Sequence, residues 1–170
     1  MDELAITVIG QDRPGIVADV ADALAGLGAN LTDSTMTRLR GHFAMTLVCT
    51  GPAAAEVERA LAPLAADGRL LATVLSVAAD EVAQRTGEPY LVSVYGADRL
   101  GIVAAVTRVL ARAGANVTDL TTRLTDRLYV LVAEVDLPPV AADAVRRELA
   151  EVGEALDIEV TLRPVESDVL

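Results

Sequence analysis

The sequence predicts an α+β protein built of two tandem modules, each with the ferredoxin-like element order β-α-β-β-α-β. The first observation behind this prediction is an internal repeat with a shift of 86 residues. Gly10–Ala18 recurs as Gly96–Ala104, and Gly28–Asp33 recurs as Gly114–Asp119, so that 15 of the 24 positions from Gly10 to Asp33 are identical. The second is that both copies alternate strand-like and helix-like stretches in the same order. Right-handed crossovers in this order place both helices on one face of a four-stranded antiparallel sheet.

The first half of each copy is predicted to be a strand, a turn and a helix. Leu4–Ile9 and Leu91–Tyr95 are short, β-branched stretches that each end at a glycine, which is typical of a strand. Apolar residues then recur at helical spacing, and the helices are predicted to stop at Gly28 and Gly114. The predicted helix positions are Ile16, Val17, Val20, Leu24 and Leu27 in the first copy and Ile102, Val103, Val106, Leu110 and Ala113 in the second.

A hairpin follows in each copy. The threonine-rich stretches 31–39 and 117–124 are predicted as second strands, with turns at Arg40-Gly41 and Thr125-Asp126. The third strands alternate in hydrophobicity, and their apolar positions match at the same shift of 86. They are Phe43, Met45, Leu47 and Cys49 in the first copy, and Tyr129, Leu131, Ala133 and Val135 in the second.

A second helix and a closing strand complete each copy. Pro63 is predicted to end or kink the first of these helices, because proline lacks the N–H that a helix interior uses. The closing strands are predicted at 70–77 and 158–162. The helix faces are marked by Val57, Leu61 and Leu64 and by Val145, Leu149 and Val152.

The domain boundaries follow from a polar stretch in the middle of the chain. Asp80–Glu88 is predicted to be a linker that ends at Pro89. We therefore expect a first module at residues 1–80, a linker at 81–89 and a second module at 90–170.

The composition of the 170 residues excludes several classes of protein. Hydrophobic residues make up 52% and charged residues 23%, which is typical of a globular chain and not of a disordered one. No apolar run reaches the roughly 18 residues of a membrane-spanning helix. The acidic start Met1-Asp2-Glu3 is unlike a secretory signal, so a cytoplasmic protein without membrane contact is predicted.

The charges and the rare residues limit the chemistry further. The net charge is −11 and the sequence contains no lysine, which disfavours direct nucleic-acid binding, Schiff-base chemistry and a phosphate-binding P-loop. The single cysteine, Cys49, and the single histidine, His42, exclude a multi-cysteine metal site and most zinc sites. The sequence predicts no catalytic residue, no metal and no cofactor.

The turn between the first strand and the first helix is the most distinctive motif. It reads Asp12-Arg13-Pro14-Gly15 in the first copy and Asp98-Arg99-Leu100-Gly101 in the second. Glycine permits close backbone approach, and the start of the next helix presents free N–H groups to a carboxylate. The aspartate can pair with an ammonium group, so the turn suits an amino-acid zwitterion. The alternative is that the aspartate only caps the helix and the glycine only makes the turn.

The second motif joins the first helix to the second strand. Gly28-Ala29-Asn30 recurs as Gly114-Ala115-Asn116. An asparagine side chain both donates and accepts hydrogen bonds, as recognition of a backbone-like ligand requires. The alternative is an asparagine in a left-handed turn beside glycine.

Together these motifs resemble the ACT domain, a small-molecule regulatory module attached to amino-acid biosynthetic enzymes. The resemblance runs from about Leu4 to Val165, and a chain of two such modules is similar to the glycine cleavage system transcriptional repressor group. It implies that a small amino acid binds between neighbouring modules, held by the turn of one and by strand residues of the other. Carried over by motif, the site residues are Asp12, Arg13, Pro14, Gly15, Ile16 and Asn30, and Asp98, Arg99, Leu100, Gly101, Ile102 and Asn116. Two departures are Gly10 and Gly96, where some members have a polar side chain, and Leu100 in place of proline.

Three functions are compatible with these motifs. The first is a non-catalytic, homo-oligomeric sensor that transmits amino-acid binding to a protein partner such as a regulator or an enzyme. The second is a ligand-independent interaction module that uses exposed strand edges. The third is a hydrolase similar to acylphosphatases, in which Arg13 with Asn30, or Arg99 with Asn116, would serve; the aspartate beside each arginine disfavours it.

The remaining polar and sulfur-containing residues are predicted to be structural. His42 is expected in a solvated hairpin turn, and Cys49 is expected to be a buried, inert thiol. The pairs Glu56/Glu58 and Glu148/Glu151 are expected on solvated helix faces.

Overall fold

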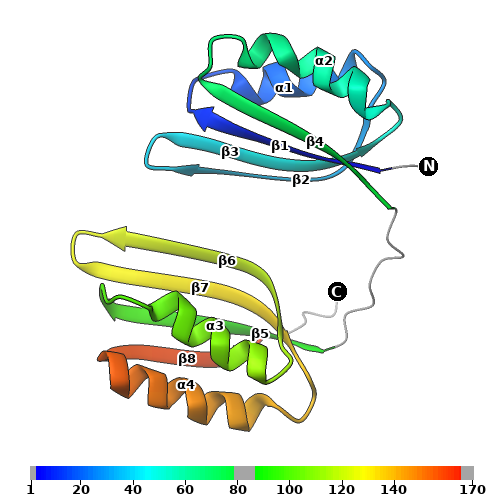
Figure 1. Ribbon diagram of the computed structural model, residues 1–170. Coiled ribbons are helices and arrows are strands. Elements are labelled where there is room, and N and C mark those ends of the chain that lie inside the picture. The colour runs from blue at the N-terminus through cyan, green and yellow to red at the C-terminus, as the bar shows by residue number, and fades with distance from the viewer. Residues whose placement is uncertain (1–2, 79–86, 166–170) are drawn as a thin grey trace. The chain divides into compact units, whose positions relative to one another are not determined.

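The computed structural model describes residues 3–78 and 87–165, which form two compact units divided between Ala83 and Gln84 (Figure 1). Each unit has the element order β-α-β-β-α-β. The first contains β1 (Glu3–Gln11), α1 (Ile16–Ala25), β2 (Asn30–Leu39), β3 (His42–Thr50), α2 (Ala54–Ala65) and β4 (Leu70–Val77). The second contains β5 (Glu88–Ala97), α3 (Ile102–Arg112), β6 (Asn116–Thr125), β7 (Leu128–Leu137), α4 (Ala142–Leu156) and β8 (Ile158–Pro164).

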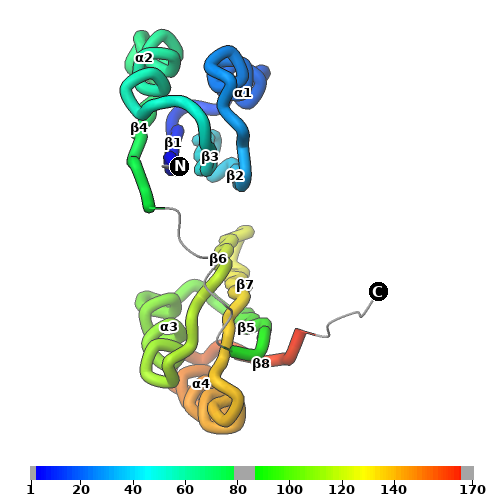
Figure 2. Tube along the Cα trace, turned by 90° about the vertical axis from the view of Figure 1, so that its right-hand side faces the viewer, coloured from blue at the N-terminus to red at the C-terminus, as the bar shows by residue number. Residues whose placement is uncertain are grey.

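Each module is one antiparallel sheet with both helices on one face, as Figure 2 shows end-on. The strand orders are β2-β3-β1-β4 and β6-β7-β5-β8, so the first strand of each module is central and its second strand lies at an edge. The predicted fold class is thereby confirmed. Within residues 3–78 and 87–165 no helix is long and apolar enough to cross a membrane.

The core of each module lies between its sheet and its helices. Most inward side chains of the central strands are buried, because alternate residues of a strand point to the helix-covered face. The best-buried large side chains of the first module are Leu4, Ile6, Leu24, Phe43, Leu47 and Leu61, and those of the second are Ile102, Leu110, Leu131, Leu137 and Leu149.

A glycine in the central strand of each module fixes how closely the closing strand approaches. Gly10 pairs with Phe43 on one side and with Leu70 on the other. A Cβ atom on Gly10 would lie 2.1 Å from the carbonyl oxygen of Arg69 and 2.6 Å from Cδ2 of Leu70. Gly96 occupies the equivalent position between Tyr129 and Ile158. These two glycines are therefore required for packing.

Four local predictions differ from the structure. Val17 is 41% exposed and Val103 is 38% exposed, so neither belongs to the helical core face. Helix α2 continues past Pro63 to Ala65, because a proline in the last turn removes only one hydrogen bond. The second hairpin turn is at Asp126-Arg127, one residue later than predicted. His42 is not in the turn but begins β3, where its side chain is exposed.

The predicted linker overlaps only slightly with the described residues. Residues 81–86 lie outside them, and Glu88 and Pro89, the last two residues of the predicted linker, belong to β5. Strand β5 therefore begins before Pro89 and includes it, because proline is tolerated near the beginning of a strand.

Candidate functional site

Both turns of interest leave the following helix without a side-chain cap. Gly15 (φ 82°) and Gly101 (φ 89°) precede α1 and α3 in a left-handed conformation, and neither helix start receives a side-chain hydrogen bond. A Cβ atom on either glycine would have no neighbour within 4 Å, so these glycines serve the backbone angle and not the packing. The alternative of an aspartate cap is therefore wrong. In α1 the Ile16 N–H already donates to the Arg13 carbonyl at 3.4 Å. The next N–H groups of α1, the first ones of α3 and the positive dipole end of each helix remain open to an anion.

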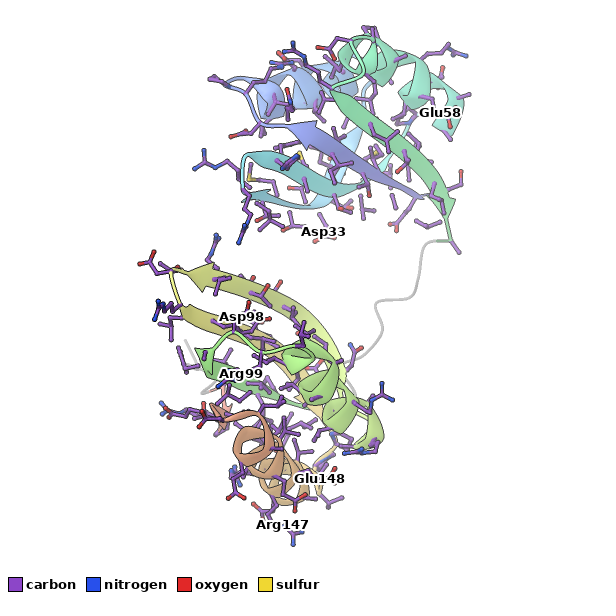
Figure 3. The ribbon with its side chains drawn as sticks, turned by 60° about the vertical axis from the view of Figure 1, so that its left-hand side comes forward. Asp33, Glu58, Asp98, Arg99, Arg147 and Glu148 are labelled. Atoms are coloured by element: carbon purple, nitrogen blue, oxygen red, sulfur yellow. The ribbon has the colours of Figure 1, made fainter. Side chains whose placement is uncertain are left out.

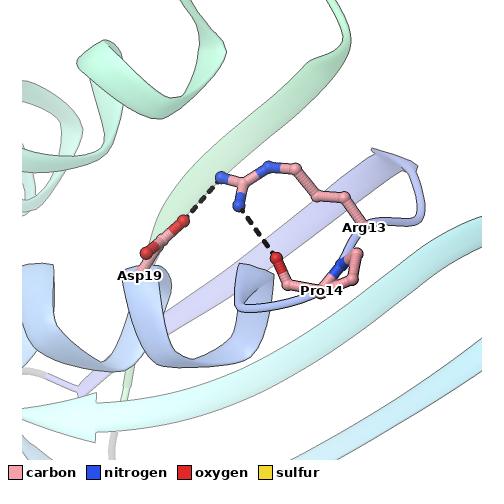
Figure 4. A network of polar contacts seen from close by, with 3 residues as sticks. All are labelled: Arg13, Pro14 and Asp19. Carbon is pink, nitrogen blue, oxygen red and sulfur yellow. Dashed lines mark hydrogen bonds and ion pairs between the residues drawn. The ribbon is translucent and has the colours of Figure 1, made fainter.

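In the first module the turn is surrounded by exposed ion pairs. The Arg13 guanidinium lies 2.6 Å from the Asp19 carboxylate and donates at 3.4 Å to the Pro14 carbonyl (Figure 4). The Asp12 carboxylate accepts from Arg38 of β2 at 3.4 Å. Such exposed pairs contribute at most about 1 kcal/mol each, so a ligand can displace them at little cost.

The second module has a different set of partners at the same positions. Arg99 lies 3.6 Å from the Asp157 carboxylate, at the end of α4. Among the described residues no hydrogen bond or ion pair is formed by Asp98, whose place beside Arg99 is marked in Figure 3. The residue equivalent to Arg38 is Leu124, which carries no charge. Asp98 is therefore the less neutralised of the two turn aspartates.

The remaining turn residues differ in exposure. The side chains of Ile16 and Ile102 are buried in the two cores at 3% and 2% exposure, so that only their backbone can meet a ligand. Pro14 is exposed, and Leu100 is 99% exposed. An apolar side chain fully in water at the second turn has no structural role within its own module.

The structure does not bring the asparagines to the turns of their own modules. Asn30 begins β2 and pairs with Thr50, which in turn pairs with Glu3 at the start of β1. Asp12 follows Gln11, the last residue of β1. The two motifs therefore lie at opposite ends of the sheet, about 26 Å apart at 3.3 Å per residue. Asn116 is placed in the same way in the second module.

This separation removes the acylphosphatase-like arrangement. That mechanism needs the arginine of the first loop and the asparagine side by side, whereas Arg13 and Asn30 lie near opposite ends of one sheet. Arg13 is also paired with Asp19, a carboxylate that would repel a phosphate. No group of three or more His, Cys, Asp or Glu that could hold a metal occurs in the described parts of the chain.

A model of the ACT domain matches residues 2–80 and 88–163. The chain belongs to the ACT domain family. Single modules are similar to UPF0237 proteins: that of Methanocaldococcus jannaschii is 36% identical over 75 residues, covering 43% of this chain and 83% of that protein. A UPF0237 protein of Listeria monocytogenes is 35% identical over 78 residues, covering 45% of this chain and 88% of that protein.

Two solved structures are similar over the whole chain. An unknown protein from Galdieria sulphuraria has a TM-score of 0.81 and 29% identity, covering 97% of this chain and 99% of that chain. A protein described as a "putative glycine cleavage system transcriptional repressor" has a TM-score of 0.75 and 21% identity, covering 98% of each chain. At 21% identity this second likeness concerns the fold of the tandem ACT modules.

The second strand of each ACT module is an open edge. Every residue of β2 is exposed, as is nearly every residue of β6. Each edge also carries exposed apolar side chains on the helix side of the sheet, and the first helix of each module carries an exposed valine. We call these two surfaces the ACT flanks: Val17, Leu31 and Met36 in the first module, and Val103, Val117 and Leu120 in the second.

A bulge in each edge strand explains the threonine that follows the asparagine motif. The strand register shifts between Leu31 and Asp33, and again between Val117 and Asp119. The hydroxyl of Thr32 donates to the Val48 carbonyl at 3.3 Å, and Thr118 makes the same bond to Glu134 at 3.2 Å. This threonine therefore supports the pairing of the edge strand at the bulge.

Two of the glutamates predicted as solvated have structural partners. Glu56 accepts from the backbone N–H of Ala53 at 3.0 Å and so supports the start of α2. Glu148 lies 2.7 Å from Arg112 and links α4 to α3. Asp19, Arg38 and Asp157 near the turns were missed by sequence reasoning, because their proximity depends on the hairpin register and on where helices end.

Cys49 is fully buried on the inner face of β3. Burial raises the pKa of its thiol, because desolvation disfavours the thiolate. The thiol therefore stays protonated at neutral pH. We expect an aromatic disulfide reagent such as DTNB to leave the native protein unmodified at pH 7 and to react with one thiol per chain in urea. Full labelling of the native protein at pH 7 would show instead that the thiol is accessible.

Proposed function

We propose that this protein is a non-catalytic regulator that binds a small amino acid where two ACT modules meet. Binding would change its affinity for a protein partner, such as a transcription regulator or a metabolic enzyme, and a coupling of about 1–3 kcal/mol suffices for regulation. The observation that carries the proposal is the uncapped helix start at Gly15 and at Gly101. Its N–H groups and dipole suit a carboxylate, and the preceding aspartate suits an ammonium group.

The asparagine would come from a second module. Asn30 and Asn116 begin edge strands, each at the end of its sheet far from its own turn. When two edge strands pair antiparallel, the start of one lies beside the end of the other. Such pairing brings an asparagine to the turn of a neighbouring module, within one chain or in a homo-oligomer. The open edges and the apolar ACT flanks support this association.

The two turns would differ in their affinity for the ammonium group. At the first turn the ammonium group must compete with Arg38 for the Asp12 carboxylate. At the second turn Asp98 has no such competitor among the described residues. The turn of the second module is therefore the favoured ammonium site.

Calorimetric titration of the full chain with each of the twenty amino acids tests the proposal. We expect at least one to bind with a Kd below about 1 mM, which corresponds to about −4 kcal/mol. Asn30→Ala or Asn116→Ala should weaken that binding about tenfold, because one hydrogen-bonding partner is lost. Glu58→Gln is the control, because Glu58 is exposed on α2 and belongs to neither motif.

The same titration distinguishes the sensor from the second candidate function. A ligand-independent interaction module is favoured by the fully exposed edge strand β2, which can accept a strand from a partner. It predicts that none of the twenty amino acids binds. Absence of binding would therefore rule out the sensor function and leave association through the strand edges and the ACT flanks. A cytoplasmic setting, where free amino acids are abundant, remains part of the sensor proposal.

A further inference from the structure

A cavity of about 310 Å³ lies in the first module, where the β1–α1 turn meets the end of α2 and the start of β4. Its volume is at the lower end of the roughly 300–1,000 Å³ typical of small-molecule sites. It needs no second module. We call it the α2–β4 pocket, and its lining residues are Gln11, Asp12, Arg13, Pro63, Leu64, Ala66, Asp67, Arg69 and Leu70.

The charges around the α2–β4 pocket are balanced. Two arginines, Arg13 and Arg69, and two aspartates, Asp12 and Asp67, line it. The pocket also lies at the end of α2, where the helix dipole is negative and favours a cation. A phosphate dianion would be repelled by the two carboxylates and by this dipole. A molecule that carries one carboxylate and one ammonium group matches both sets of charges.

The existing contacts leave the two arginines available. Arg69 lies 3.7 Å from the Asp67 carboxylate, and both side chains are mostly exposed. Arg13 is held by the exposed Asp19 on α1 (Figure 4). Each pair contributes little to stability in water, so that a ligand carboxylate can replace it without unfolding the module.

The second module lacks this combination of charges. Gly10 pairs with Leu70 in the first module, and Gly96 pairs with Ile158 in the second. Arg69 and Asp157 directly precede these two partners and are therefore structurally equivalent. The open cavity at the end of α4 and the start of β8, of about 490 Å³, includes no residue of the β5–α3 turn. Its charged lining residues are Glu154, Asp157 and Glu159, with no arginine. The neighbouring Arg99 is already paired with Asp157 at 3.6 Å.

We propose that the α2–β4 pocket is a second amino-acid site, present once per chain. In it Arg13 and Arg69 hold the carboxylate of a small α-amino acid. Asp67, together with the carbonyl end of α2, holds the ammonium group. The partly buried Leu64 and the buried Leu70 form its apolar wall. This site shares Asp12 and Arg13 of the β1–α1 turn with the one proposed between modules, but it adds Asp67, Arg69 and the end of α2 and uses neither asparagine.

Amide NMR titration of the ¹⁵N-labelled full chain with each of the twenty amino acids tests this assignment. We expect at least one to shift the amide signals of residues 67–70 in a saturable manner. Arg69→Gln and Asp67→Asn should each weaken this binding at least tenfold. Arg59→Gln, an exposed arginine on α2, should leave it unchanged. Asn30→Ala and Asn116→Ala should leave it unchanged as well.

The possible results separate the two sites. If no amino acid shifts residues 67–70, or if both pocket variants bind like the wild type, the α2–β4 pocket is not an amino-acid site. Shifts confined to Gly15, Gly101 and the two asparagines would overturn this inference and support the site between modules. Shifts confined to residues 67–70 would support the α2–β4 pocket and would count against the site between modules.

Discussion

Replacing Phe43 by alanine is expected to lower the free energy of unfolding of the first module by about 3–5 kcal/mol. Phe43 is the only phenylalanine of the chain and is completely buried on the inner face of β3. Its removal leaves a cavity that the rigid sheet cannot fill by relaxation. Because a domain is typically stable by only about 5–15 kcal/mol, this loss is a large part of the total.

Urea unfolding followed by amide NMR signals from each module measures the effect of Phe43→Ala. We expect the signals of the first module to disappear at a clearly lower urea concentration. Tyr129→Ala is the matched control, because Tyr129 stands at the equivalent position and is only half-buried. Its cost should therefore be smaller. Equal losses for the two variants would contradict the packing described here.

Gly10→Ala is expected to destabilise the first module by about 1–3 kcal/mol or more, although alanine is normally a mild substitution. The new methyl group would lie 2.1 Å from the Arg69 carbonyl oxygen, which is backbone and cannot rotate away. Strands β1 and β4 would have to separate. The hydrogen bond from the Gln11 N–H to the same carbonyl, at 3.1 Å, would be strained as well.

Gly26→Ala provides the control for Gly10→Ala. Gly26 has a right-handed helical conformation with φ −60°, and a Cβ atom there would have its nearest neighbour at 3.4 Å. We expect this change to be neutral or to stabilise by up to about 1 kcal/mol, since alanine reduces the freedom of the unfolded chain. Thermal unfolding followed by circular dichroism compares the two variants. A Gly10→Ala protein as stable as the wild type would show that β4 does not approach β1 this closely.

The fold could be predicted because its signals are local and occur twice. The alternation from Phe43 to Cys49 and the helical spacing from Ile16 to Leu24 each report which face is buried. The prediction failed at Val17, an apolar residue at helical spacing whose side chain is 41% exposed. Sequence periodicity does not distinguish a core face from an association surface.

The candidate site could be predicted only in part. The turns and their glycines are motifs of neighbouring residues, and the left-handed conformation of Gly15 and Gly101 follows from them. The distance from Asp12 to Asn30 could not be predicted from these motifs, because it depends on chain direction. Helix α1 carries the chain back to the beginning of β1 before β2 starts. The neighbours of Asp12 and Arg99, namely Arg38 and Asp157, depend on strand register and on helix length.

A crystal structure of the full chain grown with its tightest-binding amino acid tests most directly whether the ligand binds at the helix starts between modules. We predict density for the ligand at a β1–α1 or β5–α3 turn, with its carboxylate on the first helical N–H groups. An asparagine side chain from another module, Asn30 or Asn116, should lie within hydrogen-bond distance. Empty turns in crystals that hold the amino acid elsewhere, with both asparagines in solvent, would contradict this proposal.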